Sequence, residues 1–529
     1  MADNWKNSAP LLAAVVALPL MSASSAEGAT FRFAFQSDAA TLDPYGIAEN
    51  FTQSLLNNIY EPLVRYNGDM VLEPSLAVSW EQTDPLTWRF NLRDDVTFHD
   101  GSPFTADDVV FSLERAQSEG ADMALYVGAI TEIKVIDDHT IDLITKAPEP
   151  ILDQIIARWL IMDREWAEAH GAQKPTSLGD SQEAYVTTHA NGTGPFRLVS
   201  REPGLKTVLE PNPDWWDEPQ HNLTEVIFTP ITADATRTAA LLSGELDLMY
   251  PVPLQDVERV NAADGISVLQ GPEIRTIFLG MDQFRDELPD SDVKGKNPLK
   301  DVRVRQALYQ AIDVDAIHDK IMRGASTPAG LLVGPGIRGF EEKHNDRLPY
   351  DSEAAKGLLA EAGYPDGFAL TMDCPNDRYV NDEAICQAVV SMLGRIGVDA
   401  SLLAQTKSLY FQKLLANEVS FYLLGWTSDS MDSGSVIANL MVPPEDGGLK
   451  WNGGHYGNPR ITELSRAIKS ETDDARRDEM IAEVWEIMKA DVGYIPLHQQ
   501  ALAWASRDAV TTPQRPDNAL MLWHVQLGS

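Results

Sequence analysis

The stretch TWRFNLRDDVTFHDGSPFTADDVVFSLERA, residues 87–116, holds a strand pattern directly followed by a helix pattern. Its first part, TWRFNLR, alternates apolar and polar residues, which is typical of a strand with one buried face. Its second part opens with Thr105 as a candidate N-cap and places two aspartates in the first turn, where the helix dipole favours negative charge. The stretch therefore predicts a strand, a turn and a helix.

The same two periods recur along the whole chain. Further strand patterns are TFRFAF (30–35), TIDLIT (140–145) and LTEVIFTPI (223–231), and longer helical patterns cover 301–322 and 476–493. We find no repeat at the period of a solenoid. Because 529 residues exceed what one hydrophobic core holds, two or three domains are expected, with a mixed α/β fold.

The composition describes a well-packed globular protein, with 44% hydrophobic residues and a formal net charge of −37. A charge of this sign and size repels phosphate backbones and anionic membranes, so it disfavours nucleic acid and peripheral lipid as partners. The acidic surface serves solubility. A mild preference for cationic or zwitterionic solutes stays open beside that interpretation.

The first 26 residues are typical of a secretory signal. A lysine precedes an apolar run from Pro10 to Met21, and Ser24 with Ala26 fits cleavage after Ala26. The run is too short to cross a bilayer, no cysteine for lipid attachment lies near the cleavage point, and no later run of membrane length follows. We expect a soluble protein in an exported compartment, without a lipid anchor.

The chain contains two cysteines, Cys374 and Cys386. In an oxidising compartment a disulfide between them is plausible. A reactive thiol or a metal site is disfavoured, because no second cysteine pair or close histidine completes a set of four ligands. The sequence predicts no metal.

Common catalytic motifs are absent from the sequence. It contains no GxSxG elbow, no HExxH and no GxxxxGK[ST] loop, so we expect no enzymatic activity and no cofactor. The segment DSMDSG (429–434) looks like part of a calcium loop, but its twelfth position is Leu440, where a bidentate glutamate is needed. Among the scattered histidines, His498 in YIPLHQQ is a candidate for lining a cleft.

Several motifs in fixed order make the chain resemble the extracytoplasmic solute-binding proteins of family 5, which serve peptide, oligopeptide and nickel ABC importers. The stretch at 87–116 resembles the signature region of that family. The other motifs are EPLVRYNGDMVLEPSLAVSW (61–80), GTGPFRL (192–198), NPDWWDEP (212–219), LLSGELDLM (241–249), NPLKDVRVRQALYQAID (297–313) and AGYPDGF (362–368). The resemblance covers the whole mature chain.

The resemblance implies a two-lobed periplasmic-binding-protein fold with an extra α/β domain and a cleft that closes at a hinge. Lobe I would comprise 27–72, 194–278 and 500–529, the additional domain 73–193, and lobe II 279–499. A freely soluble periplasmic receptor, monomeric by family default, is expected.

In peptide binders of this family, GW followed shortly by Asp lies on the second lobe, and that Asp pairs with the α-amino group of the peptide. The matching residues are Gly425, Trp426 and Asp429. A desolvated ammonium needs a fixed carboxylate, and Trp426 would add an apolar or cation-π wall. Alternatively, Asp429 caps a helix that starts near Met431 and Trp426 belongs to the core. The Pro that usually follows is Ser433 here, so Asp432 is a second candidate for the amine.

Arg378 matches the position where dipeptide binders hold the peptide carboxylate, and a guanidinium binds a carboxylate with two parallel hydrogen bonds. Alternatively, Arg378 pairs with Asp377 or Asp382 in a solvated loop. A disulfide between Cys374 and Cys386 would clamp this loop to the following helix and pre-organise the site. On the first lobe, SDAATLDPYGIAEN resembles a segment that lines the cleft, and Tyr45 is a possible contact that is also consistent with a buried structural role.

The sequence thus predicts a periplasmic receptor that delivers short peptides, dipeptides above all, to the permease of an ABC importer. A different solute within the same architecture stays open: an opine or other amine-bearing compound, a nickel chelate, haem or an oligosaccharide. A secreted hydrolase is the alternative from another class, and a periplasmic chaperone or sensor is compatible with the same fold.

Overall fold

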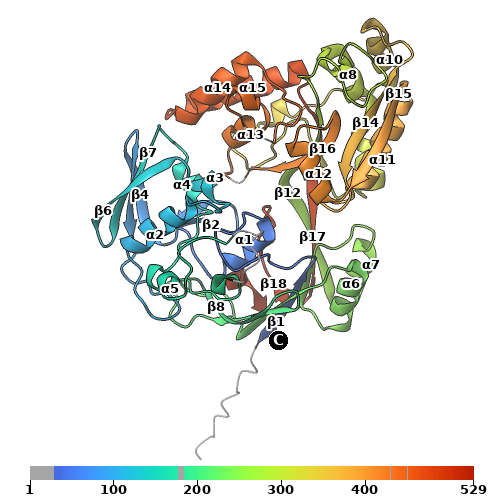
Figure 1. Cartoon of the computed structure of the whole chain (residues 1–529). Helices are drawn as coiled ribbons and strands as arrows, with labels where there is room; N and C mark the ends of the chain where they lie inside the picture. The colour runs from blue at the N-terminus through green and yellow to red at the C-terminus, as the bar shows by residue number, and fades with distance from the viewer. Residues whose placement is uncertain (1–28, 177–183, 429, 449–450, 529) are drawn as a thin grey trace, which may run out of the picture.

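A computed structural model describes residues 29–176, 184–428, 430–448 and 451–528 (Figure 1). The predicted signal peptide, 1–26, lies outside the described residues and stays a prediction. Within the described residues, no helix combines the length and the apolar character that crossing a membrane needs. Strands and helices alternate along the chain, so the predicted mixed α/β class is confirmed.

A large mixed sheet runs through the molecule in the order β15-β14-β16-β12-β17-β11-β1-β10-β9-β8, with β13 paired to β17. Parallel pairing joins β1 to β10 and β11 and joins β14 to β15 and β16, whereas β12 pairs antiparallel with β16 and β17. Its strands are β1 (Thr30–Phe35), β8 (Phe196–Glu202), β9 (Lys206–Pro211), β10 (Glu225–Pro230), β11 (Leu248–Tyr250), β12 (Ile266–Met281), β13 (Thr327–Pro328), β14 (Phe368–Pro375), β15 (Val398–Gln405), β16 (Phe421–Thr427) and β17 (Ile495–Arg507).

The strands β12 and β17 are the longest of the sheet and run between the two halves of the molecule (Figure 1). Every residue of β17 is buried except Arg507, and its apolar sequence is interrupted by the buried polar run HQQ at 498–500. The register of the pair shifts between Pro272 and Thr276 and again between Ile277 and Phe278. The predicted boundaries at 278/279 and 499/500 fall within these strands and stay predictions.

The stretch at 87–116 folds as the sequence predicts. TWRFNL forms β5 (Thr87–Leu92), in which Trp88, Phe90 and Leu92 are buried and alternate with more exposed residues. The helix α2 (Ala106–Ala116) follows with Thr105 as N-cap, and Asp108 at N3 completes a capping box. The local signals sufficed here because caps and periodicity act over a few residues.

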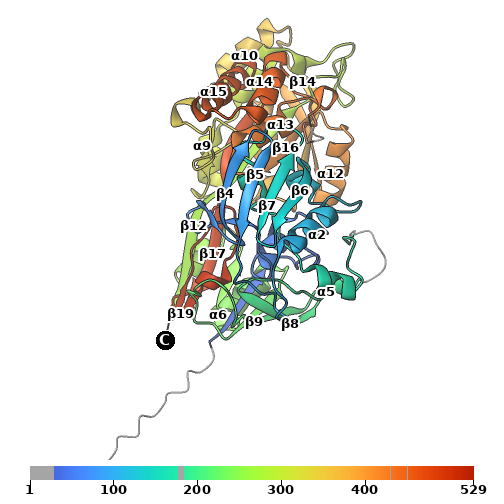
Figure 2. The same ribbon diagram turned by 90° about the vertical axis from the view of Figure 1, so that its left-hand side faces the viewer.

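These elements belong to a separate four-stranded antiparallel sheet in the order β4-β5-β7-β6, which lies on one side of the molecule (Figure 2). Its other strands are β4 (Ala77–Asp84), β6 (Ile130–Asp137) and β7 (Thr140–Thr145), and the neighbouring helices are α3 (Ala124–Val127), α4 (Leu152–Ile156) and α5 (Arg164–Ala169). Two small ribbons complete the strands, β2 (Val64–Tyr66) with β3 (Leu72–Pro74), and β18 (Val510–Thr511) with β19 (Gln526–Leu527).

Most of the remaining helices lie in the upper half of Figure 1, whereas α1, α6 and α7 lie in its lower half. The remaining helices are α1 (Asn50–Leu56), α6 (Asp234–Ser243), α7 (Val257–Asn261), α8 (Val302–Ala311), α9 (Val314–Ala316), α10 (Ser352–Glu361), α11 (Asp382–Gly394), α12 (Lys407–Leu415), α13 (Ser433–Leu440), α14 (Pro459–Ser470) and α15 (Asp474–Asp491). Short helical turns occupy Tyr185–Thr187, Pro298–Lys300, Ile317–Ile321, Glu342–His344, Pro444–Asp446 and Leu522–His524.

The helical pattern at 301–322 is not one helix. The helix α8 ends at Ala311, and a second, short helix begins after Asp313. The carboxylate of Asp313 accepts a hydrogen bond from the backbone N–H of Ala316 at 2.9 Å, so it caps a new start. The continuous apolar spacing concealed this break.

Candidate functional site

The candidate site lies where the segment after β14 meets the end of β16. The segment carries Arg378 and Tyr379, whose backbone N–H groups donate to one Asp382 carboxylate oxygen at 3.0 and 2.9 Å. The Tyr379 hydroxyl donates to the Gly425 carbonyl of β16 at 3.3 Å. The turn is therefore held by the Asp382 carboxylate and by the neighbouring strand β16.

A disulfide bond joins Cys374, near the end of β14, to Cys386 in α11. The bond closes the chain around Arg378, so the arginine segment is covalently tied to the helix that follows it. The helix α11 begins after Asn381, which has φ of 56° and does not cap the helix with its side chain. Its amide instead donates to the Ile321 carbonyl at 2.9 Å.

The guanidinium of Arg378 is half-buried and lies over the Tyr379 ring, 5.1 Å from its centroid. Among the described residues, no carboxylate forms an ion pair with it. Asp377 accepts the backbone N–H of Lys407 at 2.6 Å, and Asp382 is occupied as given above, so the alternative pairing of Arg378 with either is not seen. Burial lowers the pKa of Arg378, and the nearby Arg275 cation lowers it further.

Arg275 on β12 is the second cation near this segment, and the sequence analysis missed it. Its Nε donates to Glu273 at 3.1 Å, and its guanidinium lies 6.0 Å from the centroid of the Tyr379 ring. Arg275 is thus neutralised by an ion pair on its own strand, whereas Arg378 is not. No sequence signal near 275 indicated this role, because the two arginines are about a hundred residues apart.

An aromatic group lies beside the end of β16. Trp426 makes an edge contact with Trp451 at 5.7 Å between ring centroids, and Trp451 makes another with Phe411 at 5.5 Å. Trp426 is half-buried and packs against the core without being enclosed by it. Trp451 belongs to the loop MVPPEDGGLKWNGGHYGNP, and the sequence analysis did not name it as a site residue. An aromatic residue in a polar, glycine-rich loop was the signal that could have found it.

Asp429 lies outside the described residues. Asp432, the second candidate for the amine, has another role: its two oxygens accept from Arg477 at 2.5 and 2.7 Å, and one also accepts the Gly434 backbone N–H at 2.7 Å. Both Asp432 and Arg477 are buried. Asp432 is therefore the N-cap of α13, and the helix begins at Ser433 rather than near Met431.

Tyr45 is a buried structural residue. It is fully enclosed, and its hydroxyl donates to the Leu160 carbonyl at 2.7 Å. Its ring lies beneath Arg115, which forms a buried bidentate ion pair with Asp43 at 2.6 and 2.7 Å. This pair ties the chain after β1 to α2, and Tyr45 packs within that connection. Its buried structural role, the alternative to a ligand contact, is the one seen.

His498 is enclosed within β17 and not on an open surface. It is 1% exposed, and its Nδ1 lies 3.1 Å from the Gln499 carbonyl oxygen. Burial lowers the pKa of His498 to about 4, so the ring is neutral near pH 7. The prediction that His498 lines a cleft finds no support in this placement.

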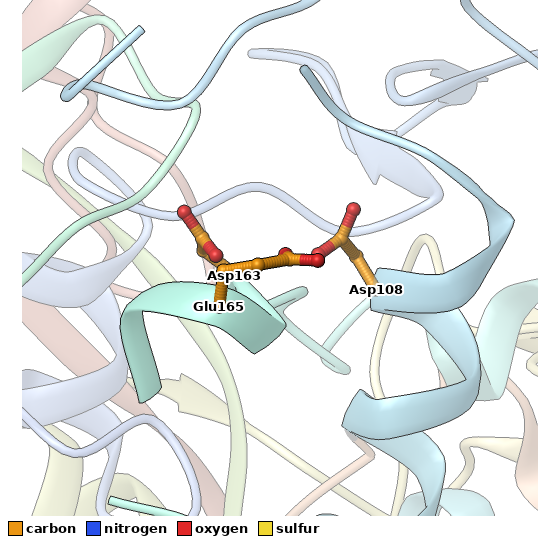
Figure 3. A group of neighbouring side chains, drawn as sticks. All are labelled: Asp108, Asp163 and Glu165. Atoms are coloured by element: carbon orange, nitrogen blue, oxygen red, sulfur yellow. The ribbon is translucent and has the colours of Figure 1, made fainter. Parts of the chain in front are cut away.

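Three carboxylates, of Asp108, Asp163 and Glu165, converge between α2 and α5 (Figure 3). Asp108 accepts the backbone N–H groups of Thr105 and Arg164 at 2.9 and 3.0 Å. Asp163 caps α5. Burial raises the pKa of Asp108 to about 7 and also raises that of Asp163. Because backbone N–H groups already donate to Asp108 and to Asp163, we assign these two carboxylates to helix capping.

The fold and the site define a class of protein: a receptor with two α/β halves joined by long paired strands, holding a cationic and aromatic site beside that junction. The model of the family "Bacterial extracellular solute-binding proteins, family 5 Middle" matches residues 71–447. The chain belongs to this family.

Similar proteins agree with this assignment over nearly the whole chain. The glutathione-binding protein GsiB of Pectobacterium atrosepticum is 26% identical over 520 residues, which cover 96% of this chain and 95% of that protein. The periplasmic binding protein DppA of Helicobacter pylori, solved with the peptide STSA, has a TM-score of 0.78 at 24% identity and covers 95% of this chain and 98% of its own. AgaA from A. tumefacien R10, solved with agropinic acid, has a TM-score of 0.76 at 21% identity, covering 94% and 99%.

The family assignment confirms the predicted two-lobed fold and the resemblance on which it rested. Proteins of this family are periplasmic receptors that bind small solutes and work with ABC permeases. The prediction that the chain is not an enzyme is confirmed on the same ground.

Proposed function

We propose that this receptor captures short peptides, dipeptides above all, and that Arg378 holds their C-terminal carboxylate. The observation that carries the proposal is the half-buried guanidinium without an ion-pair partner among the described residues. A cation that loses water gains most from a bidentate carboxylate, which restores the lost hydrogen bonds in a fixed geometry. The rigid support of Arg378, by Asp382 and by the disulfide, lowers the ordering cost of binding.

The other end of the ligand needs an acceptor for its amine. From the sequence we keep Asp429 as that acceptor, a proposal that rests on its position after the GW pair. Trp426 and its partner Trp451 offer an apolar wall near the same strand end. Asp432, Tyr45 and His498 are not part of the proposed site, for the reasons given above.

The biological setting completes the proposal. We further propose that the protein leaves the cytoplasm through a signal peptide cleaved after Ala26 and acts as a periplasmic monomer. It closes over the peptide and passes it to its permease in the inner membrane. The names of GsiB and the DppA complex support a peptide ligand, since glutathione and STSA are both peptides.

Calorimetric titration tests this function with alanylalanine, its C-terminal amide and its N-acetyl form. We expect wild type to bind the free dipeptide and to lose about 30-fold in affinity for the amide, because a charged hydrogen-bonded partner is removed. Arg378→Met should bind the dipeptide and its amide with equal, weak affinity. Arg395→Met, an exposed arginine at the end of α11, is the matched control and should behave as wild type.

Equal affinity of wild type for the free dipeptide and the amide would contradict the carboxylate role of Arg378. An opine is the second candidate ligand, favoured by the AgaA complex with agropinic acid, which also offers a carboxylate. Titration with opines in the same series distinguishes a peptide receptor from an opine receptor. In a peptide receptor, acetylation of the dipeptide amine should also weaken binding.

A further inference from the structure

The strands that join the two halves of the molecule carry a bulge at their midpoint. Pro272 pairs with Ala501, and the next pair along the strands is Thr276 with Gln499. Three residues of β12, numbered 273–275, therefore oppose the single residue Gln500 of β17. A bulge bends its strand and turns side chains in directions that a regular ladder does not allow.

The side chains at the bulge form a continuous chain of hydrogen bonds. Glu273 accepts from Arg275 at 3.1 Å with one oxygen and from the Gln500 amide at 2.5 Å with the other. The amide oxygen of Gln500 accepts the backbone N–H of Val380 at 3.0 Å. Glu273, Arg275 and Gln500 are 4%, 7% and 9% exposed, so little water competes for these bonds.

This chain of hydrogen bonds reaches the segment of Arg378 at the residue after those that Asp382 holds. The carboxylate of Asp382 holds the backbone N–H groups of Arg378 and Tyr379, and Gln500 holds that of the next residue, Val380. Glu273 also neutralises Arg275, the cation that shares the Tyr379 ring with Arg378. The position of the Arg378 backbone and the charge around its guanidinium thus both depend on the bulge.

We propose that Gln500 and Glu273 are positioning residues that hold Arg378 in register for a ligand carboxylate. The proposal rests on the proposed function. Neither residue needs to touch the ligand. Gln500 fixes the backbone from which Arg378 projects, and Glu273 orients the Gln500 amide so that its oxygen points at Val380. A buried amide satisfied at both ends specifies one arrangement, because any other leaves polar groups without partners.

The test compares wild type, Gln500→Met, Arg378→Met and the double variant in titrations with alanylalanine and alanylalaninamide. Methionine keeps the volume of glutamine but makes neither hydrogen bond. We expect Gln500→Met to lose about tenfold in affinity for the free dipeptide, which is the size of coupling seen between residues that act together. Its affinity for the amide should not change. In the Arg378→Met background, Gln500→Met should change neither affinity.

A loss of equal size for both ligands, or a loss that persists in the Arg378→Met background, would assign Gln500 a purely structural role and overturn the inference. If Gln500→Met does not fold, Gln500→Asn replaces it, since the shorter amide cannot span Glu273 and Val380 and the same results are expected. If wild type does not distinguish the dipeptide from its amide, the proposed function itself fails. If wild type prefers the free dipeptide over its amide and the Gln500 variants keep the same preference, the positioning role is contradicted while the proposed function stands.

Discussion

At the scale of single residues, the partners of a buried carboxylate decide in which direction its pKa moves. Asp108 and Asp142 lie in the same sheet-and-helix unit, and both are buried. Asp108 accepts only from backbone N–H groups and a hydroxyl, so burial raises its pKa to about 7. Asp142 accepts a bidentate hydrogen bond from Arg89, which lowers its pKa. Two aspartates of one unit therefore respond to pH in opposite directions.

Asp108→Asn should reveal this in the pH dependence of unfolding. Because the folded-state pKa of Asp108 is raised, its contribution to stability is full below about pH 4 and is lost as pH rises toward 7. The advantage of wild type over Asp108→Asn in the free energy of unfolding should fall by about 1 kcal/mol per pH unit across that window. Urea denaturation at several pH values measures it.

Asp142→Asn is the matched control. Its lowered pKa places the change in stability below pH 4, so its difference from wild type should stay constant between pH 4 and 7. A constant difference for Asp108→Asn over the same window would contradict the raised pKa.

At the scale of the element, the contribution of an N-cap residue to stability depends on the burial and the charges around it. Asp432 and Asp351 are both N-caps that accept a backbone N–H two residues on. Asp351 is exposed at the start of α10, whereas Asp432 is buried and neutralises Arg477. The same residue type in the same position thus carries two different roles.

Asp432→Ala should destabilise the protein far more than Asp351→Ala. Loss of Asp432 leaves the Arg477 cation buried without its partner, which costs about 3–5 kcal/mol. Loss of the exposed cap costs about 1 kcal/mol. Chemical denaturation of both variants checks the comparison, and similar losses would show that the buried ion pair adds nothing to the cap.

At the scale of the whole molecule, the junction of the two halves is formed by β12 and β17, and the bulge between Pro272 and Thr276 interrupts their pairing. A regular ladder resists bending, whereas an interrupted one concentrates bending at the interruption. The candidate site lies beside this interruption, so we expect a ligand held there to contact the segment that bends when the lobes close.

We expect a bound dipeptide to shift the population toward a closed form. Small-angle X-ray scattering should then record a smaller radius of gyration for wild type with saturating alanylalanine. Arg378→Met at the same ligand concentration should scatter as the unliganded protein. Saturable binding of the dipeptide by calorimetry without any change in scattering would rule out closure.

The sequence by itself determined the class of fold and the family. Strand alternation, the Thr105 cap and seven motifs in order are local signals, and they held in β5, in α2 and in the match to family 5. The sequence also indicated the cysteine pair, which forms a disulfide. These signals succeeded because each depends on neighbours in the chain or on a pattern kept in order along it. The ligand-binding role of Arg378 stays a prediction.

Only the tertiary structure decided which polar groups meet. Gln500 reaches Val380 across 120 residues, and Arg477 takes both oxygens of Asp432 across 45 residues. No periodicity encodes such pairs, since they follow from how β17 lies against the segment after β14 and from how α13 packs near α15. The same packing buried Tyr45 and His498. Whether a polar side chain binds a ligand or a neighbour is settled by burial and by available partners, and both are properties of the folded molecule.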